Sequence, residues 1–113
     1  MSSERPLPGF VRLGVFERAT KGLLSEEEQR ELEKVLIEDP ELGDRISGAG
    51  GVRKLRFATG GRGKSGGVRV IYYYRSNVGR IYLITAYPKN VKGGVTKAEK
   101  NQMAKLTAIL DGE

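Results

Sequence analysis

The chain has 113 residues with 20 Lys and Arg against 14 Asp and Glu, a formal net charge of +6. It has no cysteine and no histidine, which excludes disulfides, thiolate metal sites and histidine acid–base chemistry. No apolar run reaches the roughly 20 residues of a membrane span, and the first ten residues lack the apolar segment of a secretory signal. We therefore expect one cytoplasmic domain over residues 1–113.

The first third of the chain shows helical spacing of its apolar residues. Residues 14–24 carry Val15, Phe16, Ala19 and Leu23 at that spacing. Residues 25–28 (SEEE) form a capping box, which predicts that a second helix spans roughly residues 26–38. An Asp-Pro pair at 39–40 ends this helix, because the residue before proline avoids the helical region.

The rest of the chain changes to strand-like alternation. We predict strands at residues 52–58, 68–74 and 80–87, with a hairpin turn at 76–79 and a short edge strand near residues 10–13. A second capping box at 96–99 (TKAE) opens a C-terminal helix. The predicted fold is α+β, with helices packed on one face of a small antiparallel sheet.

The charge is distributed unevenly along the chain. Residues 45–98 contain no Asp or Glu, yet they carry twelve Lys and Arg. Lys54 and Arg56 project to the same side of one predicted strand, Arg69 lies on the next, and Lys89 follows the third. If these strands are adjacent, four cations meet on one surface. Like charges on adjacent strands repel, so this pattern indicates a phosphate-bearing partner such as nucleic acid.

Residues 58–65 (ATGGRGKS) match a permissive phosphate-loop pattern. That motif works when its amides open a helix, whereas here a predicted strand follows. We therefore interpret the segment as a basic hairpin loop in which Arg62 and Lys64 contact a nucleic-acid backbone.

Five tyrosines accompany the basic residues. Tyr72 and Tyr74 share the register of Val68 and Val70, which places them in the core. Tyr73 lies on the side of Arg69. Tyr87, which ends the third strand near Lys89, is positioned to stack on a base or bind a phosphate.

The segment GGVRKLRFATGGRGKSGGVRVIYYY, followed by RIYLITAYPKN and VTKAEK, resembles the RelE/HigB superfamily of toxins from bacterial toxin–antitoxin modules, in particular its HigB-like branch. The resemblance implies a RelE-like fold with two N-terminal helices, a small antiparallel sheet and a C-terminal helix. It also implies an endoribonuclease that cuts mRNA on the 70S ribosome. The implied partner is a cognate antitoxin, HigA-like with a helix-turn-helix, through which alone operator DNA would be bound.

By position, the resemblance assigns catalytic roles to Lys54, Arg56, Arg69 and Lys89, although a shift of one residue would select Asn90. The family's best-studied branch stacks a C-terminal aromatic residue on its substrate, and this chain has no aromatic residue after Tyr87. The full set of expected RNA contacts comprises Arg53, Arg62, Lys64, Tyr73, Tyr87, Asn90 and Lys92.

A ribonuclease without histidine, metal or cofactor must activate the ribose 2′-hydroxyl in another way. We expect Lys54 to act as or assist the general base, two arginines to stabilise the phosphorane, and Lys89 to stabilise or protonate the leaving oxygen. Two alternatives stay open: a ParE-like toxin of the same fold that poisons gyrase, and a non-catalytic RNA- or ribosome-binding module.

Overall fold

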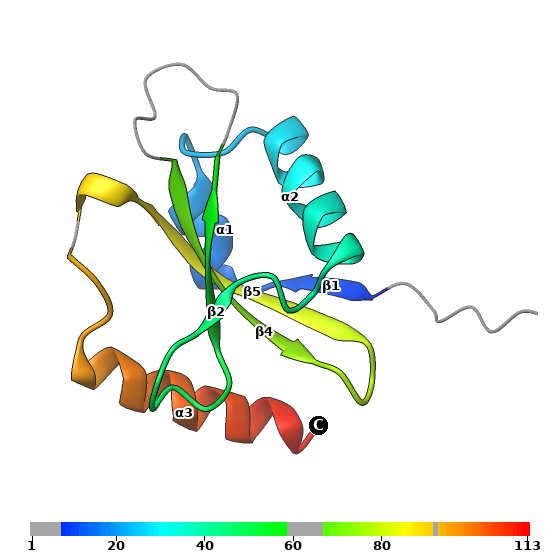
Figure 1. Ribbon diagram of the computed structural model, residues 1–113, viewed down its shortest axis with the longest axis vertical. Helices are drawn as coiled ribbons and strands as arrows, with labels where there is room; N and C mark the ends of the chain where they lie inside the picture. The colour runs from blue at the N-terminus through cyan, green and yellow to red at the C-terminus, as the bar shows by residue number, and fades with distance from the viewer. Residues whose placement is uncertain (1–7, 59–66, 92) are drawn as a thin grey trace, which may run out of the picture.

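The computed structural model describes residues 8–58, 67–91 and 93–113 (Figure 1). Its strands are β1 (Gly9–Arg12), β2 (Asp44–Arg45), β3 (Arg53–Phe57), β4 (Val68–Arg75) and β5 (Arg80–Pro88). Its helices are α1 (Gly14–Thr20), α2 (Glu26–Glu38), α3 (Lys97–Asp111) and the short 3₁₀ helix η1 (Lys89–Val91). The sheet order is β1-β5-β4-β3-β2, with β1 parallel to β5 and every other pair antiparallel. The predicted α+β class is confirmed.

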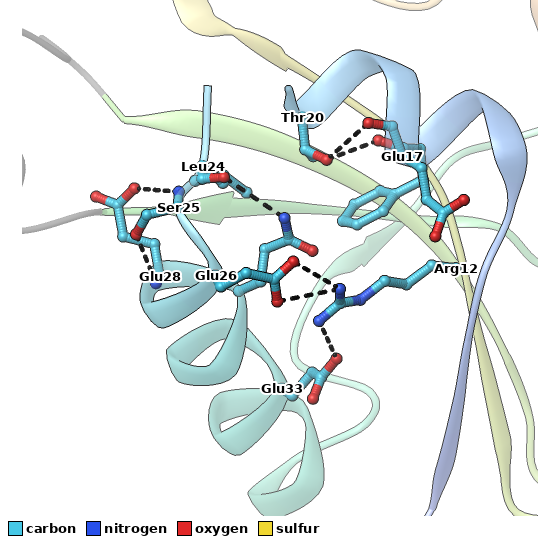
Figure 2. Close-up of polar contacts among 10 residues, drawn as sticks. Arg12, Glu17, Thr20, Leu24, Ser25, Glu26, Glu28 and Glu33 are labelled. Atoms are coloured by element: carbon cyan, nitrogen blue, oxygen red, sulfur yellow. Dashed lines mark hydrogen bonds and ion pairs between the residues drawn. The ribbon is translucent and has the colours of Figure 1, made fainter. Parts of the chain in front are cut away.

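Both predicted capping boxes are present. The Ser25 hydroxyl accepts from the Glu28 amide at 3.0 Å, and the Glu28 carboxylate accepts from the Ser25 amide at 2.9 Å (Figure 2). Thr96 and Glu99 form the same reciprocal pair at the start of α3. These contacts satisfy amides that have no partner inside the helix, so local sequence determines where α2 and α3 begin.

The sheet carries a hydrophobic core on each of its two faces. On one face, Phe16 of α1 and Leu32 of α2 pack against Leu55, Val70 and other buried sheet residues. On the opposite face, residues of α3, including Met103 and Leu106, pack against Ile71 and Ile84. In Figure 1, α3 runs along a separate side of the sheet from α1 and α2. The expectation that all helices share one face is therefore wrong, because apolar periodicity defines the buried stripe of a helix but not the face that it covers.

The segment that joins α2 to β3 is fixed by Tyr72, which is 0% exposed. Its hydroxyl accepts from the Gly43 amide and donates to the Pro40 carbonyl, both at 2.9 Å. A side chain at position 43 would lie 2.9 Å from the Lys54 carbonyl oxygen, so only glycine permits this close approach. These contacts lead the chain into β2, a two-residue strand that the sequence did not predict.

The acidic N-terminal part of the chain uses some of its carboxylates within the fold. The Arg12 guanidinium donates to Glu33 at 3.1 Å and to both carboxylate oxygens of Glu26 at 3.4 Å (Figure 2). Burial alone would lower the pKa of Arg12, but these two carboxylates outweigh it and raise the pKa above its ordinary value. The ion pairs fasten the edge strand β1 to α2.

The C-terminal end of α3 is held by Arg75, a buried residue at the end of β4. Its two terminal nitrogens donate to the carbonyl oxygens of Leu110 and Asp111, each at 3.0 Å, and more weakly to that of Glu113. The guanidinium group of Arg75 therefore satisfies carbonyls that have no partner within the helix.

None of the helices within residues 8–58, 67–91 and 93–113 has both the length and the apolar character needed to cross a bilayer.

Candidate nucleic-acid interface

Three functional candidates form a row across β3, β4 and β5, one residue from the ends of these strands. In the strand register, Arg56 of β3 lies directly opposite Arg69 of β4, and Arg69 lies directly opposite Tyr87 of β5. Directly opposite residues project to the same face, with Cβ atoms about 4.5–5.5 Å apart. Strands β3, β4 and β5 are therefore adjacent, which is the condition for the predicted cations to meet on one surface. Arg56, Arg69 and Tyr87 share one face of the sheet.

Lys54 extends this surface toward the edge of the sheet. It lies two positions before Arg56 on β3, so both side chains project to the same face. Lys54 is opposite Ile71 of β4 on one side and Asp44 of β2 on the other. The Asp44 carboxylate therefore lies beside Lys54, the predicted catalytic lysine. The sequence had suggested that this surface carries only cations.

An open hollow of about 330 Å³ lies beside Lys54. Strands β2 and β3, the loop before α3 and the first turn of α3 surround it, and its lining residues are Asp44, Arg45, Ile46, Lys54, Val95 and Lys100. Lys100 thus joins Lys54 from an element that packs onto the same face. Sequence reasoning assigned neither Asp44 nor Lys100 to the site.

Lys89 and Asn90 lie just beyond β5, in η1, and both are exposed. The Lys89 amide donates to the Gly67 carbonyl at 3.4 Å, and Val68 pairs with Pro88. This brings η1 to the beginning of β4, two residues before Arg69. Lys89 is therefore near the row, and the register does not favour it over Asn90.

Two of the expected RNA contacts are engaged inside the protein. The Arg53 guanidinium donates to the carbonyl oxygens of Gly43 at 2.8 Å and Glu41 at 3.1 Å. Arg53 alternates with Lys54 along β3, so it lies on the opposite face from the row. Its placement indicates a structural role in holding the segment before β2.

Tyr73 is tied to α3. Its hydroxyl donates to the Asp111 carboxylate at 2.7 Å, and its ring stacks on Tyr82 with centroids 6.4 Å apart. Burial, followed by this hydrogen bond, raises the pKa of Tyr73 to about 12. Contact of Tyr73 with RNA stays a prediction, and it would compete with these internal contacts. Tyr72 is fully buried and Tyr74 partly so, as their register with Val70 predicted.

The glycine-rich segment does not lead into a helix. Gly67 has φ +77° and a side chain there would lie 2.7 Å from the Phe57 carbonyl oxygen, so the chain turns tightly into β4. Because Val68–Arg75 is a strand, the helix N-terminus that a phosphate loop needs is missing at this point. The hairpin interpretation is confirmed in this respect. The proposed contacts Arg62, Lys64 and Lys92 lie outside the described residues.

Comparison with known proteins gives consistent results for family and fold. Residues 27–112 match the family model described as the RelE toxin of the RelE/RelB toxin–antitoxin system. The structure of a mutant of the E. coli toxin RelE in the free state aligns with a TM-score of 0.54 at 16% sequence identity. The alignment covers 90% of this chain and 98% of that one. At this identity the structural match supports the fold alone.

Proposed function

Because the chain belongs to the RelE toxin family of toxin–antitoxin systems, we propose that it is a ribosome-dependent endoribonuclease that inhibits translation by cutting mRNA. The row of Arg56, Arg69 and Tyr87 is the observation that carries this proposal. Two arginines directly opposite each other on neighbouring strands repel, and a bound phosphate would relieve that repulsion. A tyrosine in the same row adds a surface on which a base can stack.

The proposed reaction needs no metal. The ribose 2′-oxygen loses its proton and attacks the adjacent phosphorus, so a 2′,3′-cyclic phosphate forms as the bond to the 5′-oxygen breaks. Arg56 and Arg69 stabilise the charge that develops on the phosphorane, since their forks donate two hydrogen bonds each. Lys54 acts as or assists the general base, and Lys89 protonates or stabilises the departing 5′-oxygen.

The ribosome would contribute the orientation of the substrate. Lysine is a poor proton acceptor at neutral pH because its ordinary pKa is about 10.4, so a site of this composition should be slow on free RNA. A decoding-site mRNA held in an attack geometry would compensate by several powers of ten. We therefore propose mRNA on the 70S ribosome as the substrate and free RNA as a much weaker one.

The family implies a cognate antitoxin as the second partner. We propose, as finer assignments, that the toxin is of the HigB-like branch, that the antitoxin is HigA-like with a helix-turn-helix, and that operator DNA is bound only through it. A small helix-turn-helix gene next to the gene for this chain would support these three assignments, and an antitoxin of another fold would contradict them.

The decisive experiment compares Arg69→Ala with Arg30→Ala. Arg30 is an exposed residue of α2, which covers the other face of the sheet from the row. Arg30→Ala therefore removes the same charge at a distant position. We expect Arg69→Ala to lower mRNA cleavage on purified ribosomes by about 10²–10³-fold, and Arg30→Ala to lower it less than twofold. Cleavage sites are mapped by primer extension, and thermal melting verifies that both variants fold.

Four outcomes would overturn parts of the proposal. Undiminished cutting by Arg69→Ala would remove Arg69 from the site. Equal cutting of free and ribosome-bound mRNA would remove the ribosome from the mechanism. Absence of cutting by the unmodified protein, with a DNA-damage response in cells that express it, would favour the gyrase-poisoning alternative. Absence of both RNA cutting and a DNA-damage response would favour a non-catalytic RNA-binding module.

A further inference from the structure

Asp44 lies within the candidate site, although its position in the sequence does not indicate this. Asp44 is the last acid before the acid-free residues 45–98, yet the β2–β3 register sets it directly opposite Lys54. Directly opposite residues share a face, so Asp44 lies on the face of Arg56 and Arg69. It is also the one carboxylate among the six described residues that line the hollow beside Lys54.

Three cationic residues line the hollow together with Asp44, beside the apolar Ile46 and Val95. Lys54 faces it from β3, Lys100 faces the same hollow from α3, and Arg45 follows it on β2. A carboxylate on a phosphate-binding surface weakens the attraction for the phosphate. Acceptance of a proton during the reaction is one role that would account for a carboxylate at this position.

We propose, on the premise that the protein cleaves RNA as set out above, that Asp44 is the general base of the reaction and that Lys54 assists it. A carboxylate oxygen has lone pairs that can accept the 2′-hydroxyl proton, and a lysine ammonium group is a donor suited to a phosphate oxygen.

The step is balanced in protons and electrons. Asp44 accepts the 2′-hydroxyl proton as the 2′-oxygen forms its bond to phosphorus. The P–O5′ bond breaks with its electron pair, and the 5′-oxygen takes a proton from a cationic side chain of the site. The proton held by Asp44 then returns to solvent, and the side chain that protonated the 5′-oxygen takes up a proton from solvent. Neither a metal ion nor any other co-reactant is needed.

A competing explanation makes the opposite prediction for RNA binding. If Asp44 only offsets the surrounding positive charge, Asp44→Asn should bind RNA more tightly and cleave at least as fast. If Asp44 only holds β2 in place, its loss should loosen RNA binding and raise KM. If Asp44 is the base, kcat should fall while binding stays equal or becomes tighter.

The test compares Asp44→Asn with Glu41→Gln on ribosome-bound mRNA under single-turnover conditions. Glu41 is an exposed acid three residues earlier in the same segment and outside the hollow beside Lys54, so the control removes the same charge nearby. RNA affinity is measured with an mRNA that carries a 2′-O-methyl group at the mapped cleavage position. Asp44→Glu keeps the carboxylate on a longer side chain, and thermal melting verifies folding.

We expect Asp44→Asn to reduce kcat about 100-fold or more with equal or tighter RNA binding. Glu41→Gln should stay within about twofold of the unmodified protein, and Asp44→Glu should recover at least about tenfold over Asp44→Asn. Asp44→Asn cleaving within threefold of the unmodified protein would overturn the inference and leave the ribonuclease proposal standing. If the unmodified protein cuts no RNA, the proposed function itself fails.

Discussion

The contact between Tyr72 and the segment before β2 leads to a sharp prediction about stability. Tyr72→Phe removes a single oxygen from a fully buried side chain whose ring packs in the core shared with α1 and α2. The ring keeps its packing, but the Gly43 amide loses its acceptor and the Pro40 carbonyl loses its donor. The change therefore isolates the two hydrogen bonds.

The expected cost follows from the burial of the partners. Each neutral hydrogen bond contributes about 1 kcal/mol net, and a buried donor left without a partner costs roughly 1–3 kcal/mol. Gly43 is buried, whereas Pro40 is partly exposed, so the unpaired Gly43 amide should account for most of the loss. We expect the free energy of unfolding to fall by about 2 kcal/mol.

Urea denaturation followed by far-ultraviolet circular dichroism measures this loss. With a slope of about 2 kcal/mol/M, the midpoint should fall by about 1 M at unchanged slope. Tyr74→Phe is the matched control, because Tyr74 lies on the same strand, packs against the same core and has no hydroxyl partner within the described residues. Its midpoint should shift by less than about 0.3 M. Equal midpoints for the two variants would refute the reasoning.

Two further predictions concern the contacts that fasten α3. Tyr73 has its pKa raised to about 12, so this tyrosine ionises in the unfolded chain near pH 10 before it ionises in the folded one. Its contribution to stability is therefore complete below about pH 10 and is lost as the pH rises toward 12. The phenolate absorbance step near pH 12 should be smaller by one tyrosine in Tyr73→Phe, and a step of undiminished size in that variant would contradict the assignment. Arg75→Met removes the fork that binds the Leu110 and Asp111 carbonyls, and should cost about 2 kcal/mol. Hydrogen exchange should accelerate at the C-terminal end of α3 but not in β4, and uniform acceleration would show that Arg75 supports the whole sheet instead.

The elements that the sequence predicted correctly are those specified by neighbouring residues. The capping boxes at Ser25 and Thr96 determine where α2 and α3 begin, and the alternation in Val68–Arg75 identifies β4 within one residue. Each of these signals is complete within a few positions, so it can be identified without knowledge of contacts to distant residues.

The features that escaped prediction depend on contacts between distant residues. β2 has two residues, which is too short for any alternation, and it exists because β3 offers an edge to pair with. Asp44 reaches the candidate site through that pairing, and Lys100 reaches it because α3 packs on the face opposite to α1 and α2. The charge pattern predicted that Lys54, Arg56 and Arg69 would share a surface but could not reveal the acid beside them.

The pairing of β1 with β5 has a consequence for the time at which the fold is completed during synthesis. Gly9 pairs with Arg80, 71 positions later in the chain, and the row across the sheet is complete only when Tyr87 has joined Arg69. Chains emerge from the ribosome N-terminus first, and contacts between distant segments form late. Arg56 is synthesised 13 residues before Arg69 and 31 residues before Tyr87, so a nascent chain carries it without its neighbours for part of its synthesis. On our proposal, the ribosome that makes this toxin is protected from it until the sheet closes.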